Sequence, residues 1–222
     1  MDTGGFPVDL VLFGMVAGFL VLRLRSILGR RTGFERPQTQ QPFQPPGAPP
    51  AGPVIEGHAE PAPASTRAVP DPGSPLGQML SRMKAIDRGF DPGGFLDGAD
   101  KAFRLIVAAF AAGDRARLRS LVSDDVYRAF EQAVTAREQA GHAQTSEIKD
   151  IPSATIEEAD LRGTVAQVTV RFVSDQISLT KDRSGQPVAG TDAVTEITDI
   201  WTFERDLSSQ DPTWRLVSVR GA

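Results

Sequence analysis

The stretch FDPGGFLDGADKAFRLIVAAFAAGD, residues 90–114, decides the fold. Asp91 can cap a helix that starts there, Pro92 suits its first turn, and the Ala-Gly-Asp sequence at the end is a usual helix stop. Between these signals the apolar side chains recur at helical spacing: Phe95, Ala99, Ala102, Phe103, Ile106, Val107 and Phe110. The pattern predicts a long central helix that packs against a sheet.

Further helices are predicted on both sides of this stretch. Downstream, one short helix carries Leu118 and Leu121, and Ser123 caps another whose core face is formed by Val126, Tyr127, Phe130 and Val134. Upstream, the sequence SPLGQMLSRMKAIDRGF at residues 74–90 has the apolar spacing of an amphipathic helix. Four helices are therefore expected to come first.

The upstream helix has two interpretations that the sequence leaves open. It can pack on its own domain, or its methionine-bearing face can meet a partner or lie at an anionic membrane surface. The candidate contact residues for the second interpretation are Leu76, Met79, Leu80, Arg82, Met83, Lys84 and Ile86.

Strands are predicted from about Glu147 onward, because the apolar period changes from helical spacing to strict alternation. The alternating positions are Ala166, Val168, Val170 and Phe172, then Ala193, Thr195, Ile197, Asp199, Trp201 and Phe203, with a turn at KDRSGQP between them and a last strand that contains Trp214 and Leu216. Long consecutive strands with short connections predict an α+β fold: N-terminal helices packed on a curved antiparallel sheet of about four strands.

A cone-shaped cavity is expected between the helices and this sheet. Its candidate lining residues are Phe103, Val107, Phe110, Tyr127, Phe130, Ile197, Asp199, Trp201, Phe203, Trp214 and Leu216. The two tryptophans are better interpreted as core or pocket lining than as a ligand-stacking pair, because indoles contribute much of the core burial in small sheets.

The N-terminus is predicted to be a membrane anchor. Residues 6–24 would span about 28 Å as a helix if Asp9 and Arg23 reach toward the lipid headgroups. Acidic residues precede the apolar run and arginines follow it, which is the reverse of a cleaved signal peptide. Because basic residues stay on the cytoplasmic side, we expect a single-pass protein of the bacterial inner membrane with its N-terminus outside and its C-terminal domain in the cytoplasm.

The rest of the N-terminal part is predicted to be a spacer. A basic juxtamembrane segment covers residues 25–36, and a proline-rich disordered linker covers residues 37–75, where the prolines of the chain concentrate. The folded domain is expected at residues 76–222.

Composition excludes several classes of function. The net charge is −4 and no basic stripe follows residue 75, so nucleic-acid binding is not expected. The chain has no cysteine and two separated histidines, so we predict no metal site, no metal catalysis and no cofactor. Asp199 is the one acid-base candidate, because a carboxylate on an apolar strand face would have a raised pKa. The alternative is that Asp199 pairs with an arginine such as Arg205 or Arg215, or lies near the rim of the cavity.

A family resemblance follows from short motifs in a fixed order. These are Phe90-Asp91-Pro92 with Phe95-Leu96, Ala109-Phe110-x-x-Gly113-Asp114, Leu118-x-x-Leu121, Trp201-x-Phe203-x-Arg205 and Trp214-x-Leu216. Together they resemble the domain of the forty-four-kDa subunit of the mitochondrial inner-membrane import translocase and of its bacterial relatives. The resemblance implies a nuclear-transport-factor-two-like or cystatin-like fold, an apolar pocket, and contacts with anionic lipid. The mitochondrial protein tethers a chaperone motor to the translocation channel, and we expect no counterpart of its long chaperone-binding N-terminal region here.

Two functions are favoured by these observations, and a periplasmic protein involved in envelope structure is a third possibility. The first is a membrane-anchored, non-enzymatic adaptor that binds a membrane protein or chaperone, with translocation machinery among its candidate partners, in membrane-protein biogenesis, protein transport or complex assembly. The second is a membrane-tethered small-molecule or lipid-binding sensor, or an enzyme, that uses the cavity and Asp199.

Overall fold

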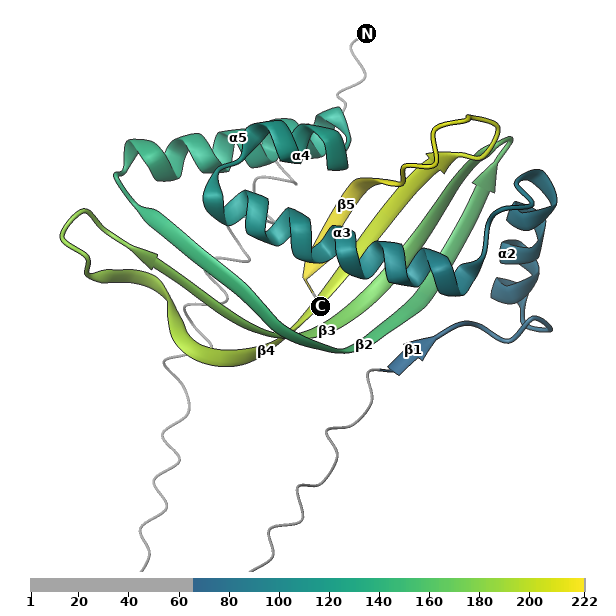
Figure 1. The fold of residues 1–222 in the computed structure, drawn as a ribbon, viewed down its shortest axis with the longest axis horizontal. Coiled ribbons are helices and arrows are strands. Elements are labelled where there is room, and N and C mark those ends of the chain that lie inside the picture. Colours follow the sequence, from purple (N-terminus) through teal and green to yellow (C-terminus); the bar gives the residue numbers. More distant parts are fainter. Residues whose placement is uncertain (1–65, 222) are drawn as a thin grey trace, which may run out of the picture.

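A computed structural model describes residues 66–221 (Figure 1). The expected anchor, the basic segment and most of the expected linker lie outside these residues. The order of elements is β1 (Thr66–Ala68), α2 (Pro75–Ile86), α3 (Pro92–Ala112), α4 (Arg115–Leu121), α5 (Asp124–Gln139), β2 (Ala143–Arg162), β3 (Val165–Lys181), β4 (Pro187–Asp206) and β5 (Arg215–Gly221). Helices followed by a sheet confirm the α+β class.

The sheet has five strands in the order β1-β2-β3-β4-β5. Strands β2 to β5 form the predicted antiparallel meander, and β1 adds a fifth strand that is parallel to β2. Thr66–Ala68 lies in the segment that was expected to be a disordered linker, so that expectation does not hold for these three residues. Their partners are residues 153–155, more than eighty positions away, and no local pattern signals such a pairing.

The sheet curves around the helices, and α3 runs across its concave face (Figure 1). The register between β2 and β3 shifts at three places, and the register between β3 and β4 shifts at two. Shifts of this kind are β-bulges, which bend the bulged strand and increase its twist. They allow strands of 17 to 20 residues to wrap around one central helix.

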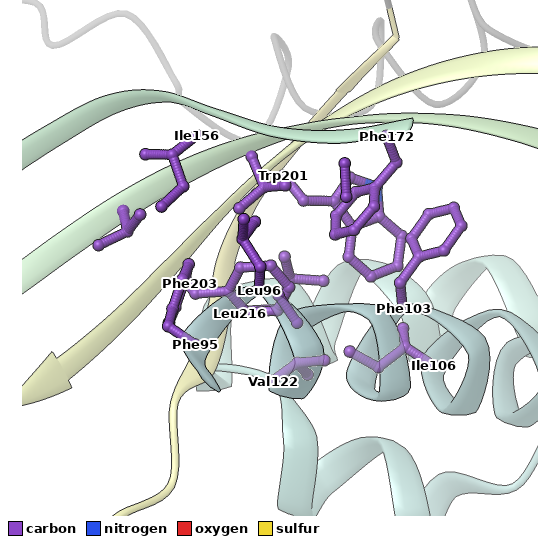
Figure 2. Close-up of a cluster of buried hydrophobic side chains, with 14 of the residues drawn as sticks. Phe95, Leu96, Phe103, Ile106, Val122, Ile156, Phe172, Trp201, Phe203 and Leu216 are labelled. Carbon is purple, nitrogen blue, oxygen red and sulfur yellow. The ribbon is translucent and has the colours of Figure 1, made fainter. Parts of the chain in front are cut away.

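The core lies between α3 and the sheet (Figure 2). Phe103 of α3 is fully buried, stacks on Phe172 of β3 at a centroid distance of 4.5 Å, and meets the edge of Trp201 of β4 at 4.6 Å. Aromatic pairs in these geometries add to the stabilisation that burial itself provides. The prediction that residues 92–112 form the central helix is therefore confirmed.

The helix ends are capped by the predicted residues and by one distant arginine. Asp91 accepts a hydrogen bond from the Gly94 N–H, and Gly113 ends α3 in the left-handed conformation at a φ of 71°. The Arg137 guanidinium donates hydrogen bonds of 2.9 and 3.0 Å to the carbonyl oxygens of Phe110 and Ala111. Arg137 thus satisfies the last turn of α3 from α5, which the sequence did not reveal.

Helix α2 packs on its own domain, which is the first of the two interpretations left open. Met83 is 0% exposed and Leu80 is buried, and both belong to the main core. Asp87 at the end of the helix forms an ion pair of 2.9 Å with Arg205 of β4. The methionine-bearing face is therefore covered from within, and Arg82, Lys84 and Ile86 remain exposed.

Within residues 66–221, no helix combines the length and the apolar character that a membrane crossing requires.

Candidate binding pocket

A pocket of about 430 Å³ opens between the N-terminal half of α3 and the loop that joins β4 to β5. This volume lies in the range of small-ligand sites, roughly 300–1,000 Å³. The loop between α2 and α3 closes one side, and Leu121 of α4 contributes at another. The lining consists of Gly89, Phe90, Asp91, Gly94, Phe95, Gly98, Ala99, Lys101, Ala102, Leu105, Leu121, Phe203, Arg205, Pro212, Thr213 and Trp214.

An aromatic cluster forms the inner wall of the pocket. The Trp214 ring lies 4.8 Å from Phe95 and 5.9 Å from Phe90, and Phe95 meets the edge of Phe203 at 6.2 Å. Two segments distant in the sequence supply these rings: the loop before α3 with the first turn of α3, and β4 with the loop after it. The rings pack on one another, and these contacts fix the position of the wall.

The floor of the pocket is a run of small residues on α3. Gly94, Gly98 and Ala102 are spaced four residues apart, so they lie on one helix face. Among residues 66–221, a Cβ placed on Gly98 would meet no atom within 4 Å apart from its chain neighbours and the backbone of its own helix. Glycine inside a helix costs roughly 0.5–1 kcal/mol relative to alanine, and no packing inside the domain requires it here. Leu105, which is 42% exposed, marks the open end of this run.

The polar groups of the pocket are largely engaged within the domain. Arg205 donates to the Asp87 carboxylate at 2.9 Å and to the Asp211 carbonyl oxygen at 3.1 Å. The pKa of Asp211 is held below its usual range, first by a hydrogen bond from the Thr213 side chain and then by the Thr213 N–H. These bonds fix the β4–β5 loop against the pocket, so it presents mainly apolar surface.

Comparison with known proteins identifies the family. The sequence profile of the Tim44-like domain matches residues 76–221. This chain belongs to the Tim44-like domain family. The resemblance inferred from the sequence motifs is therefore confirmed, and the matched range agrees closely with the range expected for the domain.

Solved structures and curated proteins add little to this assignment. The intermembrane space region of the chloroplast protein ARC6 is 11% identical, with 57% of this chain and 97% of that chain covered at a TM-score of 0.42. A conserved protein from Planctomyces limnophilus DSM 3776 is 21% identical, with 56% and 94% covered at a TM-score of 0.33. Similarity this low carries no functional information. No curated protein matches the chain.

The Tim44-like domain places the predicted lining residues in three regions. Phe203 and Trp214 line the pocket. Phe103, Trp201 and Leu216 are buried in the core beside it. The remaining residues lie elsewhere: Val107, Phe110, Phe130 and Tyr127 toward the other end of α3 and on α5, and Ile197 and Asp199 on β4. Phe110 and Phe130 pack on each other at 5.0 Å.

Several residues that line the pocket of the Tim44-like domain were not predicted from the sequence. Leu105 lies off the apolar stripe of α3, and Pro212 and Thr213 are in a loop. Gly94 and Gly98 could have indicated the site from the sequence, because glycine inside a strongly predicted helix usually has a packing or functional reason.

Asp199 lies in a buried polar group on the concave face of the Tim44-like domain. It is 8% exposed, and Gln176 donates to its carboxylate at 3.4 Å and to the Ser174 hydroxyl at 2.8 Å. Arg205, one of the two expected partners, instead pairs with Asp87. The Trp201 indole nitrogen is buried on the same strand face and has no hydrogen-bond partner among the described residues. Residues 66–221 contain no group of three or more His, Cys, Asp or Glu side chains placed to hold a metal ion.

A second group of charged contacts lies away from the pocket, where α3, α4 and α5 meet. Burial lowers the pKa of Arg137. Arg115 of α4 donates two hydrogen bonds of 2.8 and 3.1 Å to Glu138 of α5, and this contact lowers the pKa of the Glu138 carboxyl. These contacts fasten the helices and leave the pocket uncharged except at Lys101, Asp91 and Arg205.

Proposed function

We propose that this protein is a membrane-anchored binding and tethering module, whose Tim44-like domain uses the α3 pocket to hold an apolar segment of a membrane protein or a chaperone. Membership of the family supports a role associated with protein translocation or membrane-protein assembly. The mode of action is binding, without chemical change of the partner.

The apolar pocket is the observation that carries this proposal. Its aromatic wall is fixed by contacts between its own rings, and Arg205 has hydrogen-bond partners inside the domain. A site with this character gains affinity from removing apolar surface from water. Lys101 lies exposed at the lining and can favour an acidic group or an anionic lipid headgroup next to the bound segment.

The proposed location is the cytoplasmic face of the bacterial inner membrane. The apolar run at residues 6–24 would anchor the chain, and the arginines after it favour retention of the following residues in the cytoplasm. The proline-rich spacer would then let the domain act at some distance from the bilayer. A reporter fused after the last residue, active only outside the cytoplasm, would contradict this orientation.

The test is affinity capture of the full-length protein from gently solubilised membranes, with a blocked pocket and a matched control. Gly98→Leu places a side chain into the pocket at a position where nothing inside the domain obstructs it. Ala108→Leu adds the same side chain to an exposed position of α3 outside the pocket. We expect specific membrane or chaperone partners with the wild type and the control, and their loss with Gly98→Leu. Equal capture by all three proteins would refute the pocket as the binding site.

A second function is supported by the buried polar group at Asp199. The carboxylate, the Gln176 amide and the Ser174 hydroxyl lie together on the concave face. They could orient a small molecule or a lipid in a membrane-tethered sensor or enzyme. For this alternative to hold, Asp199→Asn must change ligand binding or turnover while the midpoint of denaturant unfolding stays the same.

A further inference from the structure

We propose that the proline-rich segment of this same chain, residues 42–53, occupies the α3 pocket when no partner is bound and competes with the partner for it. The inference rests on the proposed function, because it concerns the same pocket. It names the resting occupant, which is the segment that fills the pocket when no partner is bound.

The segment has a regular proline pattern. Residues 42–53 read PFQPPGAPPAGP and contain three consecutive P-x-x-P units, which begin at Pro42, Pro46 and Pro50. Residues 37–55 carry no charged side chain. Proline-rich sequences of the P-x-x-P type favour the extended polyproline II conformation and dock into aromatic-lined grooves.

The pocket offers the chemistry that such a segment needs. Its wall presents the rings of Trp214, Phe90 and Phe95, and Pro212 lies beside them. Proline has no N–H group, so a proline-rich backbone is rich in hydrogen-bond acceptors and poor in donors. The indole of Trp214 and the ammonium group of Lys101 are donors. The absence of charge in the segment also suits an apolar floor.

The dimensions agree as well. The pocket follows α3 from Gly94 to Leu105, which corresponds to about 16 Å at 1.5 Å per residue. A polyproline II helix rises 3.1 Å per residue, so about five residues, one P-x-x-P unit and a neighbour, cover this length. The glycine floor lets an extended backbone approach the helix closely.

The connection to the domain is long enough for the segment to reach the pocket. The described chain begins at Thr66 in β1, which pairs with residues 153–155 in the middle of β2, whereas α2 and the β4–β5 loop lie toward one end of the sheet (Figure 1). The thirteen residues from Pro53 to Thr66 reach about 44 Å when extended, which exceeds the diameter of a domain of this size, about 40 Å from its expected radius of gyration. A linker of this length gives an effective concentration on the order of millimolar, so a segment with a dissociation constant of about 0.1 mM occupies the pocket about 90% of the time.

The first experiment is site-specific photo-crosslinking in the full-length protein in its membrane. A benzophenone amino acid replaces Phe43, the aromatic residue of the segment. We expect intramolecular crosslinks that map to residues 89–105 or 203–214, a loss of most of these crosslinks in Gly98→Leu, and no change in Ala108→Leu. Crosslinks that lie outside these ranges, that join two copies of the chain, or that persist in Gly98→Leu would overturn the proposal.

The second experiment measures access to the pocket without a crosslinker. The chain has two tryptophans, of which Trp201 is 4% exposed and Trp214 lines the pocket, so acrylamide quenching of the fluorescence reports mainly on Trp214. Replacement of the six prolines of residues 42–53 by serine should increase the quenching constant severalfold. The same replacement of the four prolines at positions 61, 63, 70 and 72 is the matched control and should leave it unchanged. Equal quenching of the wild type and the six-serine variant would overturn the proposal.

The two proposals fail in different ways. If capture of partners depends on an open pocket but Phe43 gives no pocket crosslinks, the proposed function stands and the resting occupant is refuted. If pocket crosslinks form but capture is the same in Gly98→Leu, the occupant is correct and the pocket is not the partner site. When both hold, the six-serine variant should capture more partner than the wild type.

Discussion

The same substitution, glycine to alanine, should have opposite effects at two helical positions of this domain. Gly77 lies in the first turn of α2, and Gly98 lies inside α3. In both places alanine lowers the conformational entropy of the unfolded chain and favours the helix, which is worth roughly 0.5–1 kcal/mol. The surroundings of the added methyl group decide the sign of the net effect.

At Gly77 the methyl group has no room. Its carbon would lie 2.0 Å from the carbonyl oxygen of Asp71 and 2.8 Å from the Pro72 Cα. That oxygen cannot move freely, because the N–H and hydroxyl groups of Ser74 both donate to it, at 3.0 and 2.6 Å. The Asp71 side chain in turn holds the Gly73 N–H at 2.7 Å.

Relief of this overlap requires the loop at residues 71–73 to shift and the cap of α2 to distort. Overpacking of this kind costs typically 1–3 kcal/mol, and loss of a serine N-cap about 1 kcal/mol. After subtraction of the helix-propensity gain, we expect Gly77→Ala to lower the free energy of unfolding by about 1–3 kcal/mol.

At Gly98 no side chain or loop of residues 66–221 opposes the gain, because the added carbon meets none of their atoms within 4 Å. We expect Gly98→Ala to raise the free energy of unfolding by about 0.5–1 kcal/mol, and the melting temperature by about 1–4 °C for a domain of this size. Urea unfolding followed by tryptophan fluorescence measures both variants in the full-length protein. A Gly77→Ala variant as stable as the wild type, or a Gly98→Ala variant less stable than it, would refute this reasoning.

Three further predictions concern the core and the ion pairs. Phe103→Ala removes a fully buried ring and leaves a cavity, so the free energy of unfolding should fall by about 3–5 kcal/mol; a loss below 1 kcal/mol in urea titrations would contradict the central position of α3. Arg205→Ala leaves the largely buried Asp87 carboxylate without its cation, so the free energy of unfolding should fall by about 2 kcal/mol, between the values for exposed and buried ion pairs. A double-mutant cycle with Asp87→Asn should show that the two residues are coupled, and additive effects would contradict the ion pair. Glu138 has a lowered pKa because Arg115 hydrogen-bonds to its carboxylate. This pair therefore stabilises the fold above the unfolded pKa of about 4.3, and the stabilisation disappears as the pH falls through the lower folded pKa. Arg115→Gln should reduce the urea midpoint at pH 7 and have no effect well below pH 4, and a pH-independent difference would contradict this reasoning.

The helices and the main strands could be predicted because their signals are local. Asp91, Pro92 and Gly113 mark the two ends of α3 in the sequence, and the structure confirms each in its predicted role. The alternation of apolar residues from Ala166 to Phe172 likewise identified the core face of β3. Such patterns depend on neighbours three, four or two positions apart, which a single sequence displays directly.

The fifth strand could not be predicted for the opposite reason. Thr66–Ala68 is short and follows a run of prolines, and nothing in it alternates. Its order comes from pairing with residues 153–155 and from the ion pair between Arg67 and Asp100 of α3. Both contacts depend on where the completed fold places β2 and α3.

The sequence by itself therefore determined the class of fold, the order of the helices and of strands β2 to β5, the family, and which aromatic residues enter the core. Only the tertiary structure decided that α2 covers its own methionine face, that Arg205 pairs with Asp87, and that the pocket lies beside α3 and the β4–β5 loop. The physical reason is the range of the interactions. Helix and strand patterns arise between neighbours in the chain, whereas the pocket is the space left between segments more than one hundred residues apart, and its position depends on how the bulged sheet curves around α3.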